Sequence, residues 1–167
     1  MVVILDPSKG PPPGWVNTPI ILDREGRMWN DGEEIIHDRL LEFLRQHLRP
    51  DPDTGGWEIF VSAHERKPVI VKDVPYQILI CWGVSAAGGE PPSELWVKTY
   101  DGVEERIDPA SIEIRDNDVP YCRVKNGSAG ARFSRQAAEG LSRYYAEKDG
   151  RVVIRLKGRD YELGAAQ

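Results

Sequence analysis

The chain alternates short apolar runs with turn-forming residues, a pattern that predicts more strands than helices. Residues 19–22 and 27–29 flank the sequence Asp23-Arg24-Glu25-Gly26, which predicts a β-hairpin. Further runs are rich in β-branched and aromatic residues, and they predict three strands at residues 57–61, 69–71 and 76–82.

The second half of the chain repeats this organisation. Residues 95–100 and 103–107 flank Asp101-Gly102, a dipeptide typical of two-residue hairpin turns. A last hairpin is predicted around Gly158. The two strands of this hairpin are expected at residues 152–156 and 161–163. Two further strands, before the second predicted helix, are expected at residues 112–114 and 121–124.

Two segments carry the periodicity of amphipathic helices. Leucines that recur every four residues predict a helix over residues 37–48, which Pro50 ends. A second helix is predicted over residues 134–148, with Ser134 as its N-cap and Gly150 as its C-terminal stop. One face of the second helix carries Ala137, Ala138, Leu141, Tyr144 and Tyr145.

A short internal match favours a duplication. Asp73-Val74-Pro75-Tyr76 recurs as Asp118-Val119-Pro120-Tyr121 in a similar strand context, although a match of four residues can also arise by chance. The sequence therefore predicts an α+β fold with duplicated halves, each an antiparallel β-sheet packed with one helix. The sequence predicts an irregular arm at residues 1–17, which contains Trp15, and a first domain at residues 18–84. A linker at residues 85–93 and a second domain at residues 94–167 are predicted to follow.

Composition narrows the classes of partner. The net charge is -5, and an acidic chain lacks the surplus of lysine and arginine that nucleic acids and anionic membranes attract. No apolar run approaches the ~20 residues of a membrane span, and the N-terminus lacks the pattern of a secretory signal. We therefore expect a cytoplasmic protein that binds neither nucleic acid nor membrane. Cys81 and Cys122 lie in apolar runs, which favours reduced buried thiols, with a disulfide as the alternative.

No catalytic or metal-binding arrangement is evident in the sequence. His64-Glu65 begins like a zinc-hydrolase motif, but Pro68 stands where the second histidine belongs. The three histidines and two cysteines show no metal-ligand spacing, and Glu104 and Glu105 should point to opposite faces of a strand. The sequence therefore predicts no metal, no cofactor and no catalytic residue, and it favours a non-enzymatic protein.

One glycine-rich segment is a candidate anion site. Gly127-Ser128-Ala129-Gly130 lies among basic residues and leads toward the second predicted helix, where backbone N–H groups can hold a phosphate. The alternative is a flexible loop with solvated arginines. Arg66 and Lys67, expected in a turn, either form a second cationic lip of the same site or only keep that turn soluble.

Several segments also match the motifs of one family. They are Glu25-Gly26-Arg27-Met28-Trp29, then Gly32 and Ile36, then Val71-Lys72-Asp73-Val74-Pro75-Tyr76, and last Pro120-Tyr121-Cys122-Arg123-Val124-Lys125-Asn126-Gly127 with Arg135 beyond it. Over about residues 15–145 the chain resembles the bacterial family DUF1285, with Ser62-Ala63-His64 departing most from the family's pattern. The resemblance implies a duplicated α+β fold and a second domain superficially like a pleckstrin-homology domain. It also implies a ligand site between the domains, for a nucleotide-like molecule, and a role in signalling. It supplies no catalytic residues.

The leading hypothesis is a non-enzymatic module that binds a small, nucleotide-like anion between its halves. The predicted contact residues are Arg66, Lys67, Tyr76, Tyr121, Lys125, Arg132 and Arg135. A protein–protein adaptor that uses exposed strand edges or the tyrosine-bearing helix is the second hypothesis. An enzyme of a type that the sequence does not reveal is the third.

Overall fold

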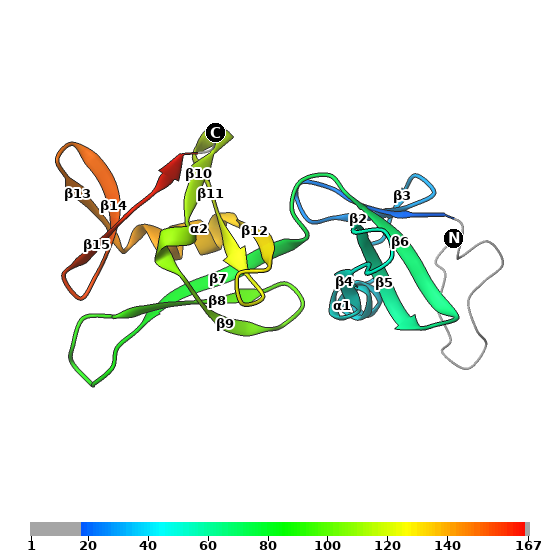
Figure 1. Cartoon of the computed structure of the whole chain (residues 1–167), viewed down its shortest axis with the longest axis horizontal. Helices are drawn as coiled ribbons and strands as arrows, with labels where there is room; N and C mark the ends of the chain where they lie inside the picture. The colour runs from blue at the N-terminus through cyan, green and yellow to red at the C-terminus, as the bar shows by residue number, and fades with distance from the viewer. Residues whose placement is uncertain (1–17, 166–167) are drawn as a thin grey trace. The chain divides into compact units, whose positions relative to one another are not determined.

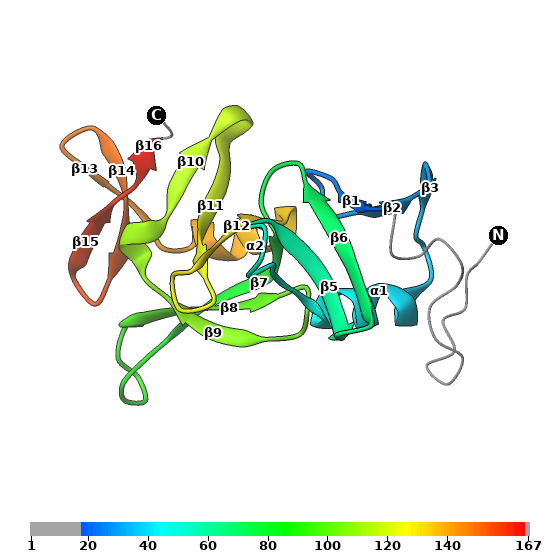
Figure 2. The same ribbon diagram turned by 45° about the vertical axis from the view of Figure 1, so that its right-hand side comes forward.

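The computed structural model describes residues 18–165 and divides the chain into two units, Met1–Pro75 and Tyr76–Gln167 (Figures 1 and 2). The predicted arm of residues 1–17, with Trp15, lies outside the described residues. The division falls after Pro75, whereas the sequence placed a linker at residues 85–93. Those residues instead connect β7 (Tyr76–Val84) to β8 (Glu94–Thr99), two antiparallel strands of the second unit.

The first unit contains one six-stranded sheet in the order β3-β2-β1-β6-β5-β4. The strands are β1 (Ile20–Leu22), β2 (Met28–Asn30), β3 (Glu33–Glu34), β4 (Leu48–Pro50), β5 (Trp57–Ser62) and β6 (Glu65–Val71). Strands β1 and β6 are parallel, so the sheet is mixed rather than antiparallel throughout. One of its faces carries the core of the unit, which includes Ile20, Leu22, Met28, Leu48, Ile59 and Val69.

Helix α1 (Asp38–Gln46) contributes the fully buried Leu44 to this core and lies beside β4 and β5 (Figures 1 and 2). The His37 ring caps its start, because Nδ1 accepts a hydrogen bond from the Leu40 N–H at 3.4 Å. The helix ends before the predicted boundary at residue 48. Leu48 is still buried, but as the first residue of β4.

The second unit contains a seven-stranded sheet in the order β16-β10-β11-β12-β7-β8-β9. Besides β7 and β8, its strands are β9 (Glu104–Ile107), β10 (Glu113–Arg115), β11 (Val119–Val124), β12 (Ala129–Phe133) and β16 (Gly164–Ala165). Short 3-10 turns η1 (Pro109–Ser111) and η2 (Asp116–Asp118) flank β10. This sheet is also mixed, because β7 and β12 are parallel.

Helix α2 (Arg135–Ser142) packs closely against β7. Ser134 is its N-cap, as predicted, and accepts a hydrogen bond from the Ala137 N–H at 3.1 Å. The helix ends at Ser142, so the prediction that it reaches residue 148 is wrong. Asp149 and Gly150 instead form a left-handed turn between two strands. These strands and the next form a third sheet, β13 (Tyr145–Lys148), β14 (Arg151–Leu156) and β15 (Arg159–Glu162).

The two large sheets share one topology, which supports a duplication. In each unit a three-stranded meander is followed by a second meander, and the first strand of the unit pairs in parallel with the sixth. The order β3-β2-β1-β6-β5-β4 thus corresponds strand by strand to β9-β8-β7-β12-β11-β10. The helices differ, since α1 lies between the two meanders and α2 follows both. The predicted α+β class with duplicated halves is therefore confirmed, with mixed sheets.

Candidate functional site

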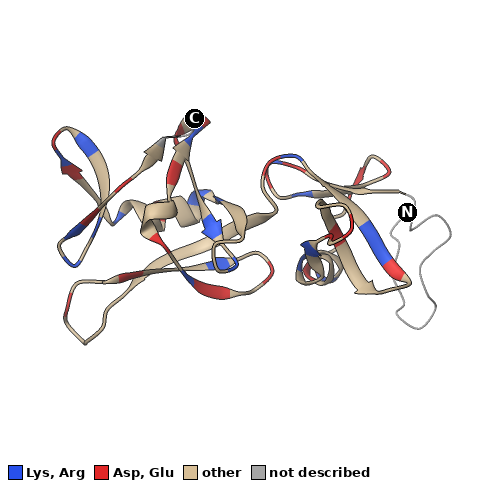
Figure 3. Cartoon of the chain, viewed as in Figure 1, with Lys and Arg blue, Asp and Glu red and all other residues tan. Residues whose placement is uncertain are grey.

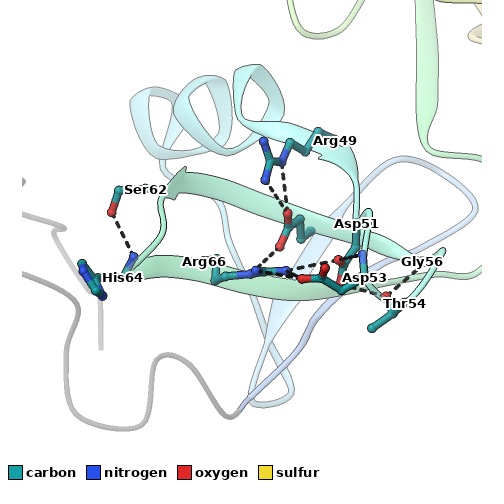
Figure 4. A network of polar contacts seen from close by, with 9 residues as sticks. Arg49, Asp51, Asp53, Thr54, Gly56, Ser62, His64 and Arg66 are labelled. Carbon is teal, nitrogen blue, oxygen red and sulfur yellow. Dashed lines mark hydrogen bonds and ion pairs between the residues drawn. The ribbon is translucent and has the colours of Figure 1, made fainter.

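Arg66 lies at the centre of an ion cluster in the first unit (Figure 4). Its guanidinium contacts carboxylate oxygens of Glu58 at 2.8 Å, Asp51 at 3.1 Å and Asp53 at 3.3 Å. Arg49 binds the other oxygen of Glu58 at 3.0 Å. Because the Glu58 side chain is only 2% exposed, the two arginines neutralise a buried carboxylate. The contacts of Arg66 within its own unit are thus those of a structural ion pair, and its contact with a ligand stays a prediction.

Arg66 and Lys67 do not form one cationic lip. Both lie in β6 rather than in the predicted turn, and neighbouring strand residues point to opposite faces. Arg66 pairs in register with Phe60, whereas Lys67 pairs with the core residue Ile59 and is 2% exposed. Burial lowers the pKa of Lys67, and Asp31 opposes that shift.

The glycine-rich segment does not lead directly into a helix. Val124 and Ala129 are register partners, so residues 125–128 form the turn of the β11–β12 hairpin. Strand β12 then separates this turn from α2. The predicted phosphate site at the N-terminus of the helix is therefore not formed by this segment.

The turn nevertheless holds an anion, which is the protein's own Glu105. The backbone N–H groups of Lys125 and Asn126 donate to the two Glu105 carboxylate oxygens at 2.8 and 3.2 Å. Both residues have left-handed backbone conformations, with φ of 55°, which point consecutive N–H groups to one side. A side chain of β9 thus fills the position that the sequence suggested for a ligand.

Lys125 and Tyr76 lie together, as the hypothesis required, but in a cluster rich in carboxylates. The Lys125 ammonium is 2.6 Å from Asp101 Oδ2 and 4.7 Å from the centre of the Tyr76 ring. Thr99 Oγ1 donates to the other oxygen of Asp101 at 2.5 Å. Burial, and secondly the charges of Asp101 and Glu105, raise the pKa of Tyr76 to about 12. Because Asp101 pairs with the Lys125 ammonium, the positive charge of this cluster is already neutralised.

Tyr121 and Arg132 lie together on another face. They are register partners on β11 and β12, and Arg132 also pairs in register with Gln77 on β7. Arg115 stacks on the Tyr121 ring, with its guanidinium carbon 4.1 Å from the ring centre. By strand alternation Arg123 points to the same side as Tyr121. We call Gln77, Arg115, Tyr121, Arg123 and Arg132 the arginine face.

The arginine face concentrates positive charge in an acidic protein. Strands β10–β12 contribute three arginines and one carboxylate to this side, and that carboxylate, Glu113, is 2.5 Å from Arg115. Tyr121 and Gln77 are buried, Arg132 is half-buried and Arg123 is exposed. Lysines and arginines elsewhere are interspersed with acidic residues in both units (Figure 3). The sequence analysis missed Gln77 and Arg115 because strand pairing, not spacing along the chain, brings Gln77 to Arg132 and Arg115 to Tyr121.

Arg135 is exposed at the first position of α2, where the Ser134 hydroxyl takes up one of the N-terminal N–H groups of the helix. Tyr144, predicted on the face of this helix, follows the helix. Its hydroxyl accepts a hydrogen bond from the Gly83 N–H at 2.6 Å. The helix face proposed for an adaptor therefore lacks both of its tyrosines, because Tyr145 begins β13.

A feature that sequence reasoning missed recurs in both units. Trp29 Nε1 donates to Asp23 at 3.0 Å, and Arg27 binds the same carboxylate oxygen at 2.8 Å. In the second unit Trp96 Nε1 donates to Glu94 at 3.0 Å, and Arg106 binds the other oxygen at 3.1 Å. Each tryptophan lies on the second strand of its unit. Each unit thus has a tryptophan–carboxylate–arginine arrangement, but Asp23 and Arg27 lie in the β1–β2 turn, whereas Glu94 lies in β8 and Arg106 in β9.

Within residues 18–165 no three histidine, cysteine, aspartate or glutamate side chains are grouped to hold a metal ion. Both cysteines are buried and unbonded to each other, and burial raises the pKa of Cys81 to about 12. None of the helices in this part of the chain is long and apolar enough to cross a membrane.

Two solved structures are similar to this chain. One is a DUF1285 family protein from Silicibacter pomeroyi DSS-3, with a TM-score of 0.64 and 18% identity, covering 93% of this chain and 88% of that one. The other is a DUF1285 family protein from Shewanella baltica OS155, with a TM-score of 0.54 and 16% identity, covering 76% of this chain and 92% of that one. No protein-family model and no curated protein matches the sequence. The chain therefore has the fold of two DUF1285 family proteins over most of its length, as the sequence motifs indicated.

Proposed function

We propose that the protein is a non-catalytic module that binds a small anionic ligand through the arginine face of its second unit. Three arginines beside a buried tyrosine and a buried amide on one face of the sheet are the observation that carries this proposal. Guanidinium groups hold carboxylates and phosphates in two-point hydrogen bonds, and the Tyr121 side chain fixes one of them by stacking.

Our proposal uses only some of the predicted contact residues. Arg66 and Lys125 each bind carboxylates of their own unit, and Lys67 lies on the core side of its sheet. Tyr121 and Arg132, which are register partners on β11 and β12, are the pair around which we place the site, with Arg123 added from the same side of the strand. A nucleotide-like molecule fits such a face because phosphate groups and stacking surfaces are what guanidinium groups bind. A role in signalling would follow from reversible binding of such a ligand.

A thermal-shift screen of the full chain against nucleotides, dinucleotides and phosphorylated metabolites tests the proposal. A ligand at ~100 times its dissociation constant stabilises the folded protein by roughly 2.7 kcal/mol, which raises the melting temperature measurably. The double variant Arg123→Ala/Arg132→Ala should lose that rise.

The matched control is Arg143→Ala/Arg151→Ala, which removes the same charge from exposed positions of the same unit outside the arginine face. This control should keep the response to the ligand. A response that survives in the Arg123→Ala/Arg132→Ala variant would reject the arginine face as the site. No response to any anion in the wild type would reject the binding function itself.

A further inference from the structure

A second surface of the second unit lies on the outer side of strands β7, β8 and β9. Register pairs Trp82 with Trp96 directly across the first two strands, and alternation turns their neighbours Leu95 and Val97 into the core, where both are fully buried. The residues that point outward with the tryptophans are Ile80, Val84, Glu94, Lys98, Glu104 and Arg106. We call this surface the tryptophan face.

The centre of the tryptophan face is apolar and reaches solvent. Ile80 is 43% exposed, and Trp82, Val84 and Trp96 are half-buried. Tryptophan is enriched among the residues that dominate protein–protein binding energy. The Trp96 indole N–H already donates to Glu94, so covering the Trp96 ring does not leave this N–H without an acceptor.

The rim of the tryptophan face carries both signs of charge in equal number. Arg106 pairs with Glu94 at 3.1 Å, and Lys98 approaches Glu104 at 4.0 Å. A strongly acidic or basic partner would meet like charges at half of these positions, which costs binding energy. A second copy of the same face, turned by a two-fold axis, can instead place its acidic side chains against basic ones.

We infer that the tryptophan face is the interface of a two-fold symmetric dimer of this chain. The two apolar centres pack against each other, and the four charged side chains of each copy surround them. This interface is independent of the arginine face, because it uses strands β7–β9 and none of the arginine-face residues.

Sedimentation velocity and light scattering of the full chain, up to about 100 μM protein, test the inference. The wild type should form a dimer whose population rises with concentration. Ile80→Glu places a charge in the apolar centre and should raise the dissociation constant about tenfold or more. Because Ile80 is exposed, this variant keeps the core of the unit intact.

The matched control is Val152→Glu, which changes an equally apolar residue, 53% exposed, on the separate third sheet. It should dimerise like the wild type. A wild type that stays monomeric at every concentration overturns the inference, as does an equal effect of Ile80→Glu and Val152→Glu.

Charge reversal gives a second, independent readout. Lys98→Glu and Glu104→Lys should each weaken the dimer, since each creates a rim with an excess of one sign. A mixture of the two single variants should form mixed dimers more tightly than either variant pairs with itself. Absence of that preference would also overturn the inference, because charge matching between copies is what favours a second copy as the partner.

Discussion

The Lys125 backbone N–H donates to the Glu105 carboxylate at 2.8 Å, and this contact joins the β11–β12 turn to strand β9. The turn contains three consecutive residues with left-handed backbone conformations, two of which are not glycine. Such conformations cost roughly 1 kcal/mol or more per non-glycine residue. The Glu105 carboxylate offsets that cost by accepting hydrogen bonds from the backbone N–H groups of Lys125 and Asn126.

Glu105→Gln should therefore destabilise the second unit. The single amide oxygen can still accept a hydrogen bond from one of the two backbone N–H groups. The amide NH₂ group is itself a donor, so it cannot accept a hydrogen bond from the other N–H. We expect the free energy of unfolding to fall by about 1–3 kcal/mol, measured by urea denaturation. Glu104→Gln, on the neighbouring exposed residue, is the control and should change it by less than about 0.5 kcal/mol. Equal effects of the two variants would contradict this role of Glu105.

Alkaline pH should weaken the second unit through Tyr76. The folded protein raises the pKa of this phenol to about 12, whereas the unfolded chain releases the proton near 10. The folded state therefore binds more protons in this window, and its stability falls as pH rises from about 10 to 12. The loss attributable to Tyr76 is about 3 kcal/mol at most.

Tyr76→Phe removes this titration, so the stability of the variant should fall less steeply than that of the wild type over the same pH range. Cys81 also titrates there, but it does so in both proteins and cancels in the comparison. Parallel stability profiles for wild type and variant would show that the phenol does not stay protonated in the fold.

The ion cluster of the first unit should be sensitive to loss of Arg66. Arg66→Ala leaves the buried Glu58 carboxylate with Arg49 as its remaining cation in the cluster. Since Arg66 is itself about one third exposed, we expect a measurable fall in the free energy of unfolding that is smaller than the full cost of a buried charge. Arg27→Ala breaks a more exposed pair with Asp23 and should lower the free energy of unfolding less than Arg66→Ala does. Denaturant unfolding of both variants compares them, and a smaller loss for Arg66→Ala than for Arg27→Ala would contradict the prediction.

The contact between α2 and β7 depends on the absence of a side chain at Gly140. A Cβ atom there would lie 2.5 Å from the Cys81 carbonyl oxygen, so the helix would have to move. Gly140→Ala should lower the melting temperature, with a cost of roughly 1–3 kcal/mol from overpacking that exceeds the gain of about 1 kcal/mol in helix propensity.

Gly88→Ala is its control, because a Cβ at Gly88 meets no atom within 4 Å. This variant should leave the melting temperature within a degree or two of the wild type. A stable Gly140→Ala protein would mean that α2 can shift along β7 without loss.

Local signals in the sequence predicted most elements but not their pairing. The hairpin around Asp101-Gly102 and the Ser134 cap follow from residues that are neighbours in the chain, so spacing was sufficient. The prediction that Gly150 ends a helix was wrong because glycine favours both helix ends and hairpin turns. The Asp149-Gly150 dipeptide, flanked by strand-forming residues, was the signal for the hairpin.

The duplication was predicted from a repeat that does not mark it. Asp73-Val74-Pro75-Tyr76 spans the boundary between the two units, whereas Asp118-Val119-Pro120-Tyr121 leads into β11, the fifth strand of the second unit. Strand order, which no single sequence displays, is what relates the halves. Prediction of the candidate site from the sequence was limited for the same reason, because strand pairing cannot be read from one sequence. Tyr121 and Arg132 meet through strand pairing. The carboxylates that bind Arg66 belong to Asp51, Asp53 and Glu58, and no sequence pattern indicated that they pair with it.

The parallel pairing of the first and sixth strands sets the order in which each unit can be assembled. Ile20 pairs with Val69, and Tyr76 pairs with Ala131, so the two meanders of a unit cannot join until the second meander has been synthesised. The hairpins can form early from neighbouring residues, but joining the two meanders closes a long loop and must come late. On the ribosome, the first unit can close its sheet while the second is still being made. Before that closure, β1 and β6 each expose an edge, and these edges are where a nascent chain of this protein is most open to wrong pairing.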